Sequence, residues 1–291
     1  MKKTYRLFLI AVAISAIAAC SNKNEPDNGP DPQAAEISLP EDPAPSGTDF
    51  KKKLLIVDFT GNKCPYCPNM TRVLRSVRSN TSYKNSTILA VAHTYNDDDP
   101  AYLNSNLDNL MGVSKYPTLV FDLFEDWKLG YSESLDANTL QNQIDIQIRR
   151  NPATAGICAA SAINDGTVTI KAGVKSGEEA ATDYYVAVMI LEDGIEAEQN
   201  NAPDDSYNTH DECIRMIEGC NGKNIAGKRL DNVLKKGECG EISFAFTLDK
   251  KIVKSNCSYV AYVSCADANG NFKVINAISA KLGESVKYQY N

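Results

Sequence analysis

Two cysteines separated by two residues stand where a buried strand is expected to turn into a helix. Residues 54–59 form a short apolar run with the β-branched Ile56 and Val57, a pattern typical of a central strand. Cys64 and Cys67 follow after a short turn. A Cys-x-x-Cys pair in this position is suited to thiol–disulfide chemistry, because its sulfurs lie close enough to form and break a bond.

The residues after the first cysteine carry the pattern of an amphipathic helix. Helical spacing places four side chains on one apolar face of residues 65–80: Met70, Val73, Leu74 and Val77. Pro65 and Pro68 fall among the first four residues, whose N–H groups have no acceptor within a helix. The two prolines therefore mark the start of the helix.

The positions of the two cysteines assign them different roles. Cys64 stands at the expected helix N-terminus beside Lys63, where the helix dipole and a cation favour thiolate, so Cys64 is the expected nucleophile. Cys67 is partly covered by the strand and is expected to resolve a mixed disulfide. Asp58 lies in the strand among apolar residues, which would raise its pKa and let its carboxylate take the proton of Cys67.

Two other uses of the cysteine pair are alternatives. In an oxidising compartment a well-placed pair also forms a purely structural disulfide. A zinc site would need more ligands, and the chain has two histidines, His93 and His210, and no second Cys-x-x-Cys. We therefore predict no metal site and no cofactor, and we interpret His93, at a strand end, as a hydrogen-bonded rather than a catalytic histidine.

Two segments resemble the thioredoxin superfamily. Val-Asp-Phe at 57–59 with Cys-Pro-Tyr-Cys at 64–67 resembles the strand, buried acid and redox pair of that family. Tyr-Pro-Thr at 116–118 resembles its cis-proline loop, and an X-Pro bond adopts cis at modest cost. The resemblance implies an α/β thioredoxin-like fold in which Pro117 faces the redox pair and shapes a groove for client proteins. Asn62 and Lys63 replace the family's Trp before the first cysteine.

The N-terminus predicts export and a lipid anchor. Basic residues precede an apolar run at 7–19, whose 13 residues are too few for a membrane span of about 20, so 1–19 is interpreted as a secretion signal. The sequence Ile-Ala-Ala-Cys ending at Cys20 resembles a bacterial lipobox, in which the cysteine is acylated. An ordinary signal peptide is the alternative. Ser21, rather than Asp, resembles the pattern of lipoproteins sorted to the outer membrane.

Composition constrains the rest of the exported chain. Residues 20–50 are rich in Pro, Asp, Glu, Asn and Gly, and they predict a disordered tether. Without the signal, the chain carries 27 basic against 37 acidic residues, so nucleic acid is not an expected partner. The expected partners are the membrane, through the lipid on Cys20, and envelope proteins with thiols or disulfides.

Six further cysteines all lie beyond residue 150: Cys158, Cys213, Cys220, Cys239, Cys257 and Cys265. An even number in an exported protein predicts up to three structural disulfides, with 15 possible connectivities. Cys257 and Cys265 share one face of an expected strand and lie about 26 Å apart at strand rise, which excludes a bond between them.

The pattern of elements predicts two domains. Residues 51–151 have the order βαβαββα, and the elements that follow the first strand and helix are expected at 87–93, 100–111, 118–124, 127–131 and 138–150. Residues 152–291 predict an antiparallel β-sandwich, with strands at 157–163, 167–174, 184–191, 241–248, 258–265 and 272–278. A long insertion at 192–240 includes a short helix expected at 211–218. The predicted fold class is an α/β thioredoxin-like domain followed by an all-β domain.

The chain as a whole resembles one family of lipoproteins. The lipobox, the redox motif and a C-terminal motif at 190–201 and 209–219, with His210 and Arg215, resemble the Omp-twenty-eight type of outer-membrane lipoproteins of Bacteroides-like bacteria. The resemblance implies an outer-membrane location. Two functions are therefore expected: a membrane-anchored thiol–disulfide oxidoreductase acting on cell-envelope proteins, or a cell-surface binding or adhesion lipoprotein with an inert thioredoxin-like scaffold.

Overall fold

The computed structural model describes residues 36–164, 166–220 and 222–291. The secretion signal at 1–19, the lipidation site Cys20 and the tether up to residue 35 lie outside the described residues. Within the described ranges, no helix has the length and apolar character needed to cross a membrane.

The end of the expected tether is bound to the folded chain. Asp42 forms an ion pair with Lys175 at 3.0 Å and accepts a hydrogen bond of 2.8 Å from the hydroxyl of Tyr290. Phe50 is buried and pairs with Tyr290 in an isolated β-bridge. The disordered tether predicted for 20–50 is therefore wrong for residues 42–50, because these contacts fix that segment.

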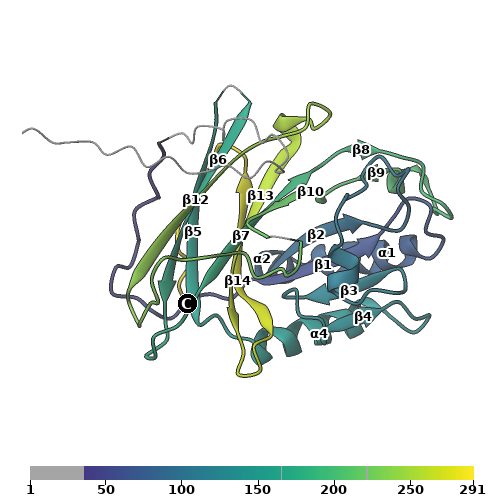
Figure 1. The fold of residues 1–291 in the computed structure, drawn as a ribbon. Helices are drawn as coiled ribbons and strands as arrows, with labels where there is room; N and C mark the ends of the chain where they lie inside the picture. The colour runs from purple at the N-terminus through teal and green to yellow at the C-terminus, as the bar shows by residue number, and fades with distance from the viewer. Residues whose placement is uncertain (1–35, 165, 221) are drawn as a thin grey trace, which may run out of the picture. The chain divides into compact units, whose positions relative to one another are not determined.

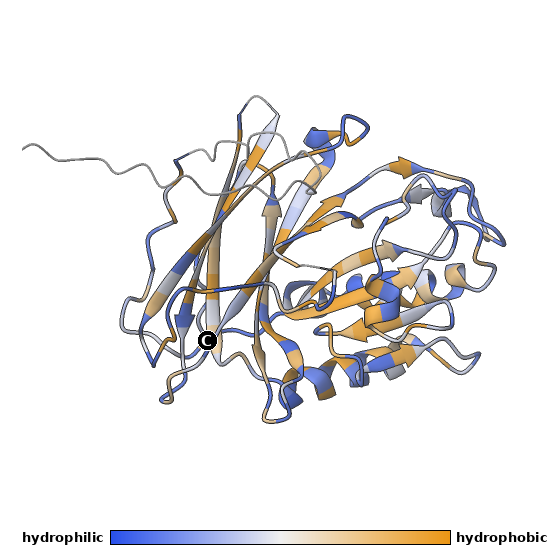
Figure 2. Ribbon diagram, in the orientation of Figure 1, coloured by the Kyte–Doolittle hydropathy of each residue, from blue (hydrophilic) through white to orange (hydrophobic). Residues whose placement is uncertain are grey.

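An α/β layer forms the N-terminal part of the described fold (Figure 1), and the cysteine pair lies at the start of its first helix. Its elements are β1 (Leu54–Thr60), α1 (Cys67–Arg78), α2 (Thr81–Ser86), β2 (Thr87–His93), α3 (Leu107–Leu110), β3 (Thr118–Phe121), β4 (Lys128–Gly130) and α4 (Ala137–Arg150). Strand β1 is buried throughout and lies between β2, which is parallel to it, and β3, which is antiparallel. Figure 2 shows hydrophobic residues concentrated on these central strands.

Side chains of β1 alternate between two hydrophobic cores. Leu54 and Ile56 pack with α1 and α4 on one face, whereas Leu55 and Val57 pack with Leu107 on the other. The helix predicted at 100–111 is wrong for most of its length, and only the single turn α3 is helical. The reason is that residues 101–103 run beside the end of β2, where the N–H of residue 103 donates to the carbonyl of residue 93.

The sheet of this layer continues into the second half of the chain. Strand β10 (Cys213–Glu218) joins β2 to β7 (Tyr185–Glu192), and the strand order is β14-β13-β7-β10-β2-β1-β3-β4. The helix predicted at 211–218 is therefore wrong, since this segment supplies the strand that bridges the open edges of β2 and β7. Consequently the predicted boundary between 51–151 and 152–291 separates elements that share one sheet.

A second sheet packs on the C-terminal part of the first. It has the order β12-β6-β5-β15, with β5 (Ala155–Asn164), β6 (Thr167–Ser176), β12 (Cys239–Thr247) and β15 (Ser285–Val286). Its partners are β7, β13 (Cys257–Ala266) and β14 (Phe272–Lys281), and β11 (Lys228–Arg229) pairs with β7. Side chains of both sheets form one hydrophobic core. The predicted strands and their sandwich packing are confirmed.

All six cysteines predicted to form structural disulfides are free thiols: Cys158, Cys213, Cys220, Cys239, Cys257 and Cys265. The strand order explains why. Cys213 and Cys257 both lie opposite Glu192 but on different sides of β7, so two strand spacings, about 10 Å, separate their backbones. Cys158 and Cys239 are separated by β6 in the same way. A disulfide needs Cα atoms within about 7 Å.

The last two cysteines lie in different cores. Cys265 packs against the core of the sandwich, and Cys220 against the core between the sheet and the α3 side of the layer. The sheet therefore stands between them. The exclusion of a bond between Cys257 and Cys265 agrees with their place at opposite ends of β13.

Candidate functional site

Cys64 and Cys67 form a disulfide, with an S–S distance of 2.01 Å and Cα atoms 5.4 Å apart. Helix α1 begins at Cys67 rather than at Pro65, so Cys64 lies in the turn before the helix. The disulfide nevertheless keeps the sulfur of Cys64 next to Cys67, the first residue of the helix. Both cysteines are 1% exposed, whereas Tyr66 between them is 62% exposed.

Three amide side chains cover the loop that carries the disulfide. The Nε2 group of Gln199 donates to the carbonyls of Asn62 (3.0 Å), Cys64 (3.2 Å) and Gly61 (3.4 Å). Two further amides, those of Asn200 and Asn201, donate to the carbonyls of residues 63 (3.0 Å) and 65 (3.3 Å). We call residues 199–201 the amide cover. No local pattern in the sequence predicts a role for these residues, although they end the motif at 190–201.

The amide cover belongs to a hairpin within the long insertion. Its strands are β8 (Ile195–Glu196) and β9 (Thr209–His210), and a 3-10 turn at Asp205–Tyr207 lies between them. The guanidinium of Arg75 on α1 stacks on the ring of Tyr207 at 4.3 Å and binds Ser206. These contacts hold the insertion hairpin, residues 195–210, against α1.

A second loop supports the opposite side of the cysteine loop. Asp99 accepts a hydrogen bond from the N–H of Asn62 at 2.7 Å, and the amide of Asn96 donates to the side chain of Asn62 at 3.0 Å. Lys63 forms an exposed ion pair with Asp98, which offsets the positive charge expected beside Cys64. Gly61 allows this approach, because a Cβ there would lie 2.6 Å from the Cβ of Tyr95.

Pro117 lies at the start of β3, next to the end of β1. The Tyr116–Pro117 bond is cis, as the Tyr-Pro-Thr motif implies. Register places Thr118 opposite Phe59, so Pro117 stands beside the point where the cysteine loop leaves the sheet. The ring of Tyr116 contacts that of Tyr95 edge-on, with centroids 5.4 Å apart. Pro117 and the cysteine loop are thus on the same edge of the layer.

Asp58 faces a cavity between the sheet and α1. The cavity has a volume of about 180 Å³ and is lined by β1, β2, α1 and the insertion hairpin. Asp58 is 3% exposed, and its Oδ1 atom has no hydrogen-bond partner among the described residues. Burial raises the pKa of Asp58 to about 7. The raised pKa expected for this acid is therefore found, and its cause is loss of hydration.

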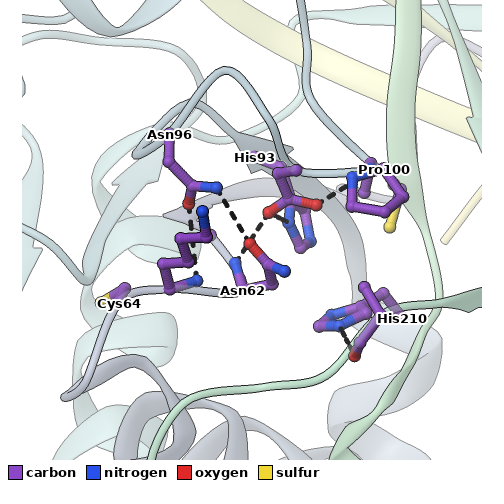
Figure 3. A network of polar contacts seen from close by, with 12 residues as sticks. Asn62, Cys64, His93, Asn96, Pro100 and His210 are labelled. Atoms are coloured by element: carbon purple, nitrogen blue, oxygen red, sulfur yellow. Dashed lines mark hydrogen bonds and ion pairs between the residues drawn. The ribbon is translucent and has the colours of Figure 1, made fainter.

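His93 lies in the same cavity and is bonded on one side only. Its Nδ1 atom is 2.7 Å from Oδ2 of Asp99, and its Nε2 atom has no partner among the residues described. His93 is thus hydrogen-bonded, as predicted, but through only one of its two ring nitrogens among the residues described. His210 contacts it edge-on with ring centroids 4.9 Å apart (Figure 3). Figure 3 shows dashed hydrogen bonds that connect the surroundings of His93 with Asn62 and Asn96, whereas His210 and Cys64 lie beside this network.

Two pKa shifts define the charges around His93. Burial acts to raise the pKa of Asp99, but hydrogen bonds from His93 and from the N–H groups of Asn62 and Ala101 lower it below its ordinary value. Burial, together with the charge of His93, lowers the pKa of His210. Asp99 is therefore an ionised partner for His93. Within the described ranges, no group of three His, Cys, Asp or Glu residues is placed to hold a metal ion.

A search of the solved structures found a similar fold. HBP35 of Porphyromonas gingivalis is 21% identical, with a TM-score of 0.65 over 81% of this chain and 77% of that protein. A β-glucosidase from Kluyveromyces marxianus matches with a TM-score of 0.24 over 48% of this chain and 15% of the enzyme, at 11% identity, which carries no argument. No match was found among the curated proteins.

The model of one protein family matches a long part of the chain. The family is described as outer membrane protein Omp28, and the match covers residues 104–286, more than half of the sequence. It includes Pro117, the insertion hairpin and both sheets of the sandwich, whereas Cys64, Cys67 and Asp58 precede it. The chain therefore belongs to the Omp28 family, whose members are outer membrane proteins.

Proposed function

We propose that this protein is an outer-membrane lipoprotein, anchored by a lipid on Cys20, that exchanges thiols and disulfides with cell-envelope proteins. The observation that carries the proposal is the disulfide between Cys64 and Cys67 at the start of α1, together with the buried carboxyl of Asp58 facing α1, whose Oδ1 atom has no partner among the described residues. A structural disulfide has no use for such an acid, and a buried charge without a partner is destabilising. Groups with shifted pKa values are typical of functional sites.

A thioredoxin-like arrangement of residues 51–151 is part of this proposal. It is supported by β1 between a parallel and an antiparallel strand, by the cysteine pair at the start of α1, and by the cis bond before Pro117. Helices lie on both faces of these strands. This layout brings the helix N-terminus and the proline loop to one edge of the layer.

The exchange reaction follows from the positions of these groups. In the reduced protein, Cys64 is the thiolate favoured by the helix N-terminus, and it attacks a client disulfide to form a mixed disulfide. Asp58 then takes the proton of Cys67, whose thiolate attacks the sulfur of Cys64 and releases the client thiol. Two electrons pass from the cysteine pair to the client. Tyr66 and Tyr95, 62% and 45% exposed, offer aromatic surface beside the loop.

The amide cover favours a second candidate function. Because both cysteines are 1% exposed and the loop carbonyls are bound, the bridge in this closed form is shielded from a client. A protein in which this arrangement never opens would be a cell-surface binding or adhesion module, with an inert disulfide that holds its loop. The two functions differ in whether the cysteine pair exchanges disulfides with client proteins.

Trapping of clients separates the two functions. Cys67→Ala should accumulate mixed disulfides between Cys64 and envelope proteins, visible as high-mass bands that disappear with reductant, and Cys64→Ala is the matched control that should trap few. The reduction potential of the wild-type pair provides the second measurement. A value of roughly −200 to −230 mV supports exchange, whereas no trapping together with a value below about −300 mV would establish the inert bridge.

A further inference from the structure

Two residues on neighbouring strands, Asp58 and His93, each direct a buried polar atom without a partner among the described residues at one cavity. Asp58 and His93 lie on the neighbouring parallel strands β1 and β2, where Asp58 is opposite Val91 and Thr60 is opposite His93. Both side chains line the cavity of about 180 Å³, together with Thr60. Asp58 Oδ1 and His93 Nε2 each have no hydrogen-bond partner among the described residues, although the two side chains are 3% and 1% exposed. Unpaired buried polar atoms of this kind are unusual and call for water or a ligand.

The hydrogen bond to Asp99 fixes which nitrogen of His93 is free. Asp99 is ionised and also accepts hydrogen bonds from the N–H groups of Asn62 (2.7 Å) and Ala101 (2.9 Å). It therefore accepts the Nδ1 proton of His93, which leaves the lone pair of Nε2 directed at the cavity. A proton bound at Nε2 would form an imidazolium, whose charge Asp99 stabilises.

The other charged groups around the cavity bind protein groups, although the Nε atom of Arg78 has no partner among the described residues. On α1, Arg78 forms an ion pair with Glu212 at 2.5 Å, and Arg75 binds Ser206. In the insertion hairpin, Nε2 of His210 is 3.1 Å from the carbonyl of residue 197. Asp211 also lines the cavity and accepts a hydrogen bond from the N–H of residue 194. Among the described residues, His93 is thus the histidine of the cavity with a fully buried ring nitrogen that has no partner.

The cavity is large enough to connect the two groups by water. Strand spacing and rise place the Cα atoms of Asp58 and His93 roughly 8 Å apart, and no direct hydrogen bond joins the two side chains. At about 30 Å³ per water molecule, the cavity has room for on the order of six. Polar atoms on Asp58, Thr60 and His93 provide partners for a hydrogen-bonded chain.

We propose that His93 receives, through water in this cavity, the proton that Asp58 takes from Cys67. The inference rests on the proposed thiol–disulfide exchange and adds the route by which its proton leaves. When glutathione disulfide oxidises the reduced protein, Cys64 thiolate forms a mixed disulfide and releases one glutathione thiolate. Asp58 removes the proton of Cys67, the Cys64–Cys67 bond forms, and the second glutathione thiolate leaves. The proton moves on through water to His93 as Asp58 takes it from Cys67, and then to solvent, so the Cys64–Cys67 bond forms only as fast as His93 accepts the proton.

The test follows decay of the glutathione mixed disulfide by acid quench and mass spectrometry, in dilute buffer near pH 7. His93→Gln should slow this decay about 10-fold, and added imidazole should restore it, because a small base can enter the cavity in place of the missing ring. His210→Gln is the matched control, since it removes the other histidine of the cavity, and its decay should stay within about twofold of wild type. A purely structural effect of the substitution would not respond to imidazole.

The outcomes separate this inference from the proposed function. Normal decay in His93→Gln, or slow decay that imidazole leaves unchanged, would overturn the proton route while exchange by the wild type still stands. A wild-type protein that forms no mixed disulfide would overturn the exchange function itself. If His93→Gln does not fold, His93→Asn replaces it in the same assay with the same imidazole rescue. In that variant too, slow decay that imidazole leaves unchanged would refute the proton route.

Discussion

Asp58→Asn should stabilise the oxidised protein by an amount that depends on pH. Burial raises the pKa of Asp58 from its ordinary value of 3.8 to about 7. Between these two values the folded protein keeps the proton, whereas the unfolded chain releases it. Because the folded state then binds more protons, stability falls as the pH rises from about 4 to 7 and is level above that. Asparagine has no proton to release, so the variant avoids this loss.

The size of the effect follows from the same shift. One pKa unit corresponds to about 1.4 kcal/mol, so the full penalty above pH 7 is about 4 kcal/mol. Part of it is already present at pH 5. The variant should therefore gain roughly 2.5 kcal/mol of unfolding free energy relative to wild type between pH 5 and pH 8. Comparing two pH values cancels any constant effect of replacing a carboxyl by an amide.

Urea unfolding of the two oxidised proteins measures this gain. With an m-value of about 3 kcal/mol per M, the difference between the two midpoints should widen by roughly 0.8 M from pH 5 to pH 8. Asp97→Asn changes an exposed carboxylate near the same site and should show no comparable gain. If the difference between Asp58→Asn and wild type is the same at both pH values, Asp58 is not a proton acceptor with a raised pKa.

Two more changes probe the cover and the thiols. Gln199→Ala removes the amide that binds three loop carbonyls and should speed reduction of the disulfide by dithiothreitol roughly 5- to 10-fold. Thr209→Val, in the same hairpin, is the control and should leave the reduction rate unchanged. Equal reduction rates for Gln199→Ala and wild type would mean that the amide cover does not shield the disulfide. Iodoacetamide should label Cys239 in the native protein and reach the buried thiols only on unfolding, and early labelling of buried thiols would contradict the strand packing.

The parts of the site that could be predicted are those encoded over short distances. One continuous segment contains the apolar run of β1, the two cysteines and the acid within the strand. The run forms a buried strand, the cysteines form a disulfide, and burial raises the pKa of Asp58, as the sequence predicts. The strands of the sandwich were predictable for the same reason, since alternation and flanking turns are local signals. The face shared by Cys257, Tyr259 and Ala261 follows directly from this alternation.

The features that were missed depend on partners distant in the sequence. Residues 213–218 are apolar enough for either a short helix or a strand, and the free edges of β2 and β7 decide for the strand. The number of cysteines suggested disulfides, but only the strand order shows that β7 and β6 separate the candidate pairs. Likewise Gln199 and Asp99 meet the cysteine loop through tertiary contacts that no local pattern announces.

In the proposed exchange, the amide cover would make the reaction rate depend on opening of the cover rather than on the reactivity of the two sulfurs. Four donor groups bind the loop carbonyls: three side-chain amides and the N–H of Asn200. At roughly 1 kcal/mol net for each, opening would need about 4 kcal/mol and would occur in about one molecule in a thousand. Small thiols would then reduce the bridge slowly. A client whose own amides bind the same carbonyls would displace the cover, so the hydrogen bonds that shield the disulfide also give the site a way to select extended peptide segments over small molecules.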